Sequence, residues 1–455
     1  MAAGPNWGTL PSVIIVEILS YLSRKDRLKT SSVCKRWRSC LFHPTLWQKV
    51  TYKLGSMYRQ QAKFLADTCG RFVRETTIEF NSHNSIEVRE CCRILDVLAN
   101  NKNTQALSIR PSSCHVEWPS VAGTDLVDRF LDNIEAVLRN SRKLQHFSLG
   151  YAEELLQYSC DFLLQLADHH SNHLESLHLA SIKEDSESYG IIELNTAPFE
   201  RFSCLHTLSI DYDHLTNNLL ELFANNRKAK LRKLTLHVHG VEPDHQGVRN
   251  ETWRKLRNYC PQLGVTINLI HSTEGTHRLL DILQVHMPLV HFRQFFCTNI
   301  NVAAINYIAT HFGNTLRSVY IMDGLLQGLP SLYHSTTPED PFVMLAWRCS
   351  KLEHFTLIGY AMSEEDVVAI ARLRGDQLKS LVLPENCLHQ GESPDDLQTW
   401  ANIGEVSDNF SHKVSEGLGQ TWHPLRDDEL HPAILNFHAD AESAYMNILL
   451  QDQTW

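Results

Sequence analysis

Histidine and cysteine are the residues of this sequence best suited to chemistry. An imidazole titrates near neutral pH, and a thiolate is both a nucleophile and a metal ligand. The chain has 25 histidines and 12 cysteines. No two cysteines form C-x-x-C, and no two histidines form H-E-x-x-H, the helical spacing of a zinc protease. The densest group is His169, His170 and His173, which we interpret as a solvated helix end rather than a metal site.

Motifs of nucleophilic and phosphate chemistry are also missing from the sequence. It contains no G-x-S-x-G elbow and no Walker loop. Sets of Cys, His and Asp can be chosen at will from so many residues, so their presence carries little weight. A thioester-forming cysteine stays open as a remote alternative. We therefore predict a protein that is not an enzyme, with no catalytic, cofactor-binding or metal-binding residues.

The negative charge of the chain is concentrated near its C-terminus. Residues 391–455 hold twelve acidic and two basic residues, which accounts for the whole net charge of −10. Nucleic acid as the main partner would require a basic surface, so we expect none. There is no signal-peptide pattern at the start, and no apolar run reaches the roughly 18 residues of a membrane helix. We expect reduced thiols, no membrane partner, and a location in the cytoplasm and/or the nucleus.

Residues 11–47 form the pattern of a small helical module. Pro11 suits a helix N-terminus, and the apolar residues after it recur at three- and four-residue spacing as far as Leu22. Ser23 can cap a second helix, with Asp26 in the capping-box position. The module has more large apolar side chains than its own interior can hold, which is typical of a binding face. The alternative is that these helices only cap the core of the next domain.

This module resembles the F-box. The matching features are a Leu-Pro start at residues 10–11, a V-C-K-x-W core at 33–37 and a closing Leu-Trp at 46–47, in this order. F-box proteins bind the Skp adaptor and, through it, a cullin-RING ubiquitin ligase, so the resemblance implies these partners. It also implies that Ile15, Leu28 and Leu41 pack internally. The implied adaptor-facing residues are Trp7, Leu10, Pro11, Ile14, Ile18, Leu22, Lys35, Trp37 and Trp47.

An irregular repeat follows the module. The pattern L-x-x-L-x-L or a variant recurs about every 25 to 40 residues, with clear copies starting at Leu144, Leu174, Leu205 and Leu231. Alternation at period two predicts a strand in each copy, and helical patterns lie between the copies. The fold class is therefore α/β, an irregular leucine-rich-repeat solenoid with parallel strands inside and helices outside. We disfavour a doubly wound sheet, because no glycine-rich phosphate loop follows any strand.

An F-box followed by degenerate repeats resembles the F-box/leucine-rich-repeat proteins. We expect the F-box in residues 1–54, the solenoid in 55–390, and an acidic C-terminal cap and tail in 391–455. The resemblance implies a substrate-recognition subunit of a Skp-cullin-F-box (SCF) ubiquitin ligase. Such a subunit binds the Skp adaptor and presents a target protein for ubiquitination and degradation. The alternative is a non-catalytic leucine-rich-repeat scaffold that acts independently of cullin.

The concave strand face of the solenoid is the candidate surface for a protein substrate. There the non-leucine positions of each strand point away from the core. The tail is a second candidate, because a terminal tryptophan is an anchor that interfaces favour. We hypothesise that about the last ten residues fold back over the strand face and contact the substrate. The predicted substrate-binding residues are Ser209, Thr235, His237, Tyr320, Thr356 and Trp455.

Overall fold

The computed structural model describes residues 7–119, 126–185, 189–225, 230–241, 245–325, 340–390, 404, 406–436 and 438–453. The chain divides into two units. Unit 1 comprises residues 1–150 and 158–175, and unit 2 comprises residues 151–157 and 176–455. None of the helices in the described ranges is long and apolar enough to cross a bilayer.

Unit 1 begins with short helices that one arginine ties together. Ser23 caps the second helix as the sequence predicts, because its hydroxyl accepts a hydrogen bond from the amide of Asp26 at 3.2 Å. Arg27 donates through its guanidinium to the carbonyls of Leu19 and Leu46, at 2.8 and 2.7 Å. One side chain therefore joins three elements. The helices are η1 (Trp7–Thr9), α1 (Ser12–Ser20), α2 (Arg24–Ser31), α3 (Lys35–Cys40) and η2 (Pro44–Trp47).

The sheet of unit 1 begins earlier than predicted. We assigned residues 1–54 to the helical domain, but Lys49–Lys53 forms strand β1, which pairs in parallel with β2. Tyr52, Ile78 and Ile109 lie side by side on three successive strands and are fully buried, as period-two alternation requires. The strands are β1, β2 (Glu75–Phe80), β3 (Ala106–Pro111) and β4 (His146–Ser148), and the helices are α4 (Arg59–Cys69), α5 (Ser85–Ala99), α6 (Leu126–Asn140) and α8 (Ser159–His170).

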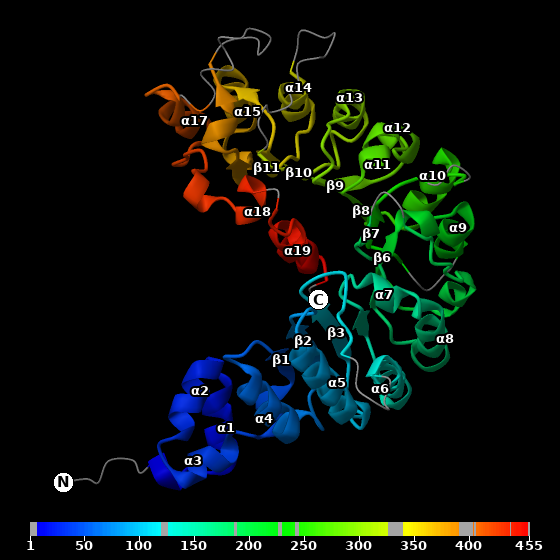
Figure 1. Ribbon diagram of the computed structural model, residues 1–455, viewed down its shortest axis with the longest axis vertical. Helices are drawn as coiled ribbons and strands as arrows, with labels where there is room; N and C mark the ends of the chain where they lie inside the picture. The colour runs from blue at the N-terminus through cyan, green and yellow to red at the C-terminus, as the bar shows by residue number, and fades with distance from the viewer. Residues whose placement is uncertain are drawn as a thin grey trace, which may run out of the picture. The chain divides into compact units, whose positions relative to one another are not determined.

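Unit 2 is built on the same repeat, which confirms the predicted α/β solenoid. Ile210, Leu236, Ile267 and Phe292 form one fully buried row across four parallel strands. The helices lie along one side of these strands (Figure 1). The sheet runs β5 (Ser176–His178), β6 (Thr207–Asp211), β7 (Lys233–Val238), β8 (Gly264–Ile270), β9 (Leu289–Phe295), β10 (Ser318–Met322), β11 (His354–Ile358) and β13 (Ser380–Val382).

The remaining elements of unit 2 complete the repeats. Short helices or 3-10 turns replace a full helix in several of them. A small parallel pair, β12 and β14, lies outside the main sheet. These elements are α7 (Glu153–Leu156), η3 (Ala197–Arg201), η4 (Tyr212–His214), α9 (Asn217–Asn225), α10 (Asn250–Tyr259), α11 (Thr273–His277), α12 (Leu279–Ile282), α13 (Val302–His311), α14 (Pro341–Arg348), β12 (Met362–Ser363), α15 (Glu364–Arg374), η5 (Gly375–Gln377), η6 (Glu385–Cys387) and β14 (Leu388–His389).

The C-terminal segment first closes the edge of the sheet and then turns back. In the cap, the indole N–H of Trp422 donates to the carbonyl of Leu381 on β13 at 2.7 Å. Helix α19 then lies on the side of the strands opposite the repeat helices (Figure 1). Residues 391–403 and Trp455 lie outside the described residues. The elements are α17 (Phe410–Leu418), η7 (Asp427–Glu429), α18 (Pro432–Leu435) and α19 (Glu442–Gln451).

A buried polar cluster lies on the side of the sheet opposite the apolar row of Ile210 and Leu236. Asp211 on β6 lies opposite His237 on β7. Its carboxylate accepts hydrogen bonds from the amide and hydroxyl of Ser181, at 2.8 and 2.6 Å, and lies 3.3 Å from Nζ of Lys183. Nδ1 of His237 and Nε2 of His239 lie 2.7 and 3.0 Å from the Ser181 carbonyl oxygen. Burial is the main cause that lowers the pKa of His239, to about 3, so this ring is neutral at pH 7.

Gly150 turns the chain directly after β4, and we predict that Gly150→Ala destabilises the protein. Its φ is +71°, and an added Cβ would overlap the carbonyl oxygen of Ile109. We expect the free energy of unfolding, measured with urea, to fall by about 2 kcal/mol or more. Gly55 is the control, because nothing lies within 4 Å of a Cβ built there. Gly55→Ala should change stability by under about 0.5 kcal/mol; equal effects would contradict the prediction.

We also predict that the free energy of unfolding falls between pH 7 and pH 5, and that His239→Gln reduces this fall. The folded pKa of His239 lies below the ordinary 6.5, so the unfolded chain takes up a proton first and stability is lost as the pH drops. One such group accounts for about 2 kcal/mol over this range. Urea unfolding at both pH values measures the difference. His412 on α17 is exposed, so His412→Gln is the control; an equal pH dependence in both variants would count against this reading.

Candidate functional site

The first candidate surface is the outward side of the N-terminal helices. On α1, Ile15 and Leu19 are fully buried, whereas Val13 and Ile14 are exposed, Ile14 by 46%. Several large apolar side chains exposed on one small module are typical of a surface that another molecule covers. The exposed large apolar residues of these helices are Trp7, Val13, Ile14, Tyr21, Leu28 and Val33.

The predicted adaptor-facing residues fall into three groups. Seven of the nine residues are accessible: Trp7, Pro11, Ile14 and Lys35 are exposed, and Leu10, Ile18 and Leu22 are half-buried. The other two, Trp37 and Trp47, are buried. The prediction also omitted Val13, Tyr21 and Val33, because the spacing of apolar residues does not show which side of a short helix faces outward.

The burial of Trp37 and Trp47 contradicts the prediction that these two side chains face the adaptor. Trp47 is only 2% exposed, and its indole N–H donates to the carbonyl of Leu41 at 2.6 Å. The indole N–H of Trp37 donates to the carbonyl of Trp7 at 3.1 Å. Since a buried indole needs an acceptor, both rings belong to the interior of the module. Ile15 and Leu41 are buried as expected, but Leu28, which we expected inside, is 38% exposed.

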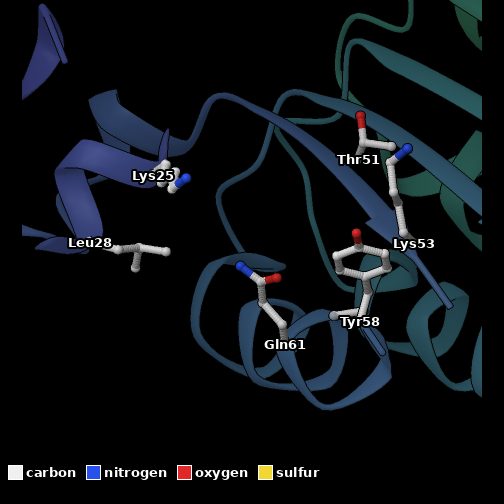
Figure 2. Close-up of a pocket in the computed structure, with 7 residues that line it drawn as sticks. Lys25, Leu28, Thr51, Lys53, Tyr58 and Gln61 are labelled. Atoms are coloured by element: carbon white, nitrogen blue, oxygen red, sulfur yellow. The ribbon is translucent and has the colours of Figure 1, made fainter. Parts of the chain in front are cut away.

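A groove of about 480 Å³ in unit 1 adjoins the exposed Leu28. Figure 2 shows Lys25 and Leu28 from α2 on one side and Tyr58 and Lys53 on the other. Nζ of Lys53 is paired with Glu79 at 3.1 Å. The mixed apolar and cationic lining of the groove extends the exposed surface toward the first repeat. The lining residues are Lys25, Leu28, Thr51, Lys53, Tyr58, Gln61 and Ala62.

The second candidate surface is the strand face of unit 2, the side of the sheet opposite the repeat helices. The register places Ser209 beside Thr235, and Tyr320 beside Thr356, as expected for residues of one face. Tyr320 is half-buried. The other predicted residues that the structure describes, Ser209, Thr235, His237 and Thr356, are buried.

This burial corrects the prediction that these four side chains touch a substrate directly. The Ser209 hydroxyl lies 2.8 Å from Nδ1 of His178. The ring of His237 lies 4.9 Å from that of Tyr151, measured between centroids. Both side chains are therefore occupied within the protein. Trp455 lies outside the described residues, so its predicted role stays a prediction.

Helix α19 covers part of the strand face. Tyr445 stacks on Phe295 with ring centroids 5.0 Å apart, and its hydroxyl lies 3.0 Å from Nε2 of His271. The hydroxyl of Tyr151 donates to the carbonyl of Leu449 at 2.7 Å. The structure therefore confirms that residues 442–453 fold back over this face. The predicted contact between this segment and a substrate stays a prediction.

Asp452 anchors the end of α19 in a cationic patch formed by Lys233 and Arg293. Nη1 of Arg293 donates to Oδ2 of Asp452 at 2.6 Å, and Nη2 donates to Oδ1 at 3.3 Å. Nζ of Lys233 donates to Oδ1 and to the carbonyl of Asp452, at 3.2 and 3.0 Å. Burial acts to raise the pKa of Asp452, but the two cations outweigh it and the pKa is lowered. Burial, followed by Arg293, lowers the pKa of His291 to about 4.

Sequence reasoning missed this cationic patch. Arg293 lies opposite Tyr320 in the register of β9 and β10, so an alignment of the repeats would have placed both on one face. Lys233 begins β7. The position of Asp452 gave no such signal, because its partners lie 159 and 219 residues away in the sequence.

Asp211, His237 and His239 are the one group of three potential metal ligands found among the described residues, with ligand atoms within 4.8 Å of one another. The ammonium of Lys183 already balances the Asp211 carboxylate. One nitrogen of each histidine is also engaged with the Ser181 carbonyl. These contacts favour a structural role. Aligning the two strands would have revealed the cluster, since Asp211 and His237 occupy matching repeat positions.

Comparison with known proteins finds F-box proteins among the relatives of this chain. Residues 7–53 match the F-box-like family. Human F-box only protein 33 is 29% identical over 92% of this chain and 83% of its own length. Mouse F-box/LRR-repeat protein 21 is 23% identical over 92% of this chain and 89% of its own length. A chain in the crystal structure of the yeast Rad7 and Elc1 complex shares 15% identity, with 84% of this chain and 90% of that chain covered and a TM-score of 0.41. Residues 7–53 are therefore an F-box-like domain, and the chain as a whole is similar to F-box only protein 33 and to F-box proteins with leucine-rich repeats.

Proposed function

We propose that this chain is the substrate-recognition subunit of an SCF ubiquitin ligase. The observation that carries the proposal is the exposed apolar surface around Ile14, on a domain that matches the F-box-like family. In this proposal the Skp adaptor covers that surface and links the chain to a cullin-RING ligase. The repeats hold a target protein beside the conjugating enzyme, so that transfer to the target becomes effectively intramolecular.

The chain itself does no covalent chemistry in this proposal. None of the twelve cysteines, all within the described ranges, forms a disulfide, and nine of them are buried. Burial raises the pKa of Cys297, Cys349 and Cys387 to about 12, so these thiols stay protonated at neutral pH. A ligase that forms a thioester needs an accessible thiolate. The nine buried cysteines do not offer such a group, whereas Cys204 is exposed and Cys34 and Cys160 are partly exposed.

We predict that Ile14→Glu lowers recovery of the Skp adaptor at least tenfold. The change places a charge in an apolar contact, and a tenfold loss corresponds to about 1.4 kcal/mol. Tagged full-length chain is purified from cells, and co-purifying adaptor and cullin are quantified by mass spectrometry. Cullin should be lost together with the adaptor, because in this proposal cullin binds the chain only through the adaptor.

Ile86→Glu is the matched control. Ile86 is 53% exposed on α5, in the same unit but outside the N-terminal helices. This variant should recover adaptor and cullin like the unaltered chain. Undiminished recovery with Ile14→Glu would overturn the proposed docking surface. Recovery of adaptor without cullin from the unaltered chain would favour a scaffold that acts independently of cullin.

A further inference from the structure

The C-terminal segment occupies the strand face of unit 2 through one side of a short helix. Tyr445, Leu449 and Asp452 follow one another at intervals of four and three residues, which places them along one side of α19 and its end. Tyr445 and Leu449 are fully buried, and the Asp452 side chain is 7% exposed. The face thus receives an aromatic ring, an aliphatic side chain and a carboxylate in a row.

The receiving surface is complementary in chemistry to the tyrosine and to the carboxylate, and it also binds the backbone between them. Phe295 provides the ring against which Tyr445 stacks, and His271 meets the tyrosine hydroxyl. Tyr151 donates to the carbonyl of Leu449. At the end of the row, the guanidinium of Arg293 and the ammonium of Lys233 meet the carboxylate, and a two-pronged guanidinium–carboxylate contact is among the strongest that side chains form. The Arg293 side chain is 13% exposed, so solvent weakens this contact little.

The occupant depends on these contacts for its own structure. Helix α19 has ten residues, and an isolated helix of that length is marginal in water. A short terminal helix can open as one unit without unfolding the repeats beneath it. The cations stay in place when it opens, because Lys233 and Arg293 belong to strands β7 and β9 of the sheet.

We propose that Lys233, Arg293, Phe295 and His271 form a binding site for a helical segment of a target protein, with an aromatic residue, an aliphatic residue and an acidic residue at positions i, i+4 and i+7. Residues 442–453 are the intramolecular occupant of this site, and a target binds by displacing them. The identification of the occupant as a target protein rests on the proposed function. The site itself follows from the contacts of the tail.

The test uses full-length chain and a fluorescein-labelled synthetic peptide of residues 438–453, with binding measured by fluorescence anisotropy. The unaltered chain should bind the peptide weakly, because its own tail competes at high effective concentration. Asp452→Asn releases the tail and should raise peptide affinity at least tenfold. Adding Arg293→Gln to Asp452→Asn should abolish this gain. The peptide with Asn in place of its aspartate at position 452 should bind neither chain.

Asp428→Asn is the matched control for removal of a tail carboxylate. The Asp428 side chain is 77% exposed, and its ion pair with Arg426, at 3.8 Å, lies outside the site. Peptide affinity should equal that of the unaltered chain. Unchanged affinity in Asp452→Asn, or a gain that survives Arg293→Gln, would overturn the site.

Hydrogen exchange of the α19 amides gives a second reading that does not depend on the peptide. Exchange should be at least tenfold faster in both Asp452→Asn and Arg293→Gln, with β7 and β9 still protected. Equal protection of α19 in all variants would show that the carboxylate does not hold the tail. Adaptor recovery is measured in the same variants and should not change. If Asp452→Asn leaves peptide affinity unchanged while adaptor recovery is intact, the result contradicts the site alone. If the unaltered chain recovers no adaptor, the result contradicts the proposed function alone.

Discussion

The parallel register of the repeats is the constraint on which the rest of the structure depends. A single strand cannot bury its alternate apolar side chains, so each repeat needs its neighbour in one fixed register. The row formed by Ile210, Leu236 and Ile267 shows the result, since all three are fully buried. The same register necessarily lines up the intervening residues on the opposite face. The row from Ser209 through Thr235 to Thr266 therefore follows from the packing of the core.

The two candidate surfaces differ in whether the chain itself covers the side chains that the core does not bury. On the N-terminal helices, Val13 and Ile14 remain in contact with water. On the strand face of unit 2, the chain supplies its own cover, through Tyr445 and Leu449. Burying the Asp452 carboxylate there is tolerable only because two cations receive it, since an unpaired buried charge costs several kcal/mol, of order 3 to 5.

Periodicity in the sequence was enough to predict the repeat, because the last two leucines of each L-x-x-L-x-L copy are two residues apart and must face one side of a strand. It could not predict burial on the other side, which depends on what the chain places there. Arg27 illustrates the limit for single residues. Its charge and helical position fit a solvated face, yet its guanidinium binds carbonyls 8 and 19 residues away. Trp47 was expected outside and is buried, whereas Leu28 was expected inside and is exposed. The reason is the same, since spacing alone does not orient a short helix.

The sequence distances in the C-terminal contacts determine when the strand face can be covered during synthesis. Neighbouring strands can pair as soon as each repeat has emerged, but Tyr151 must wait for a partner 298 residues later. At about 5 to 20 residues per second, that interval lasts roughly 15 to 60 seconds. Each aromatic or cationic residue of the face is therefore open to chaperones and to other nascent chains from its own synthesis until the tail follows. The ribosome therefore makes the repeats first and their cover last, so every molecule passes once through an uncovered state before its tail can dock.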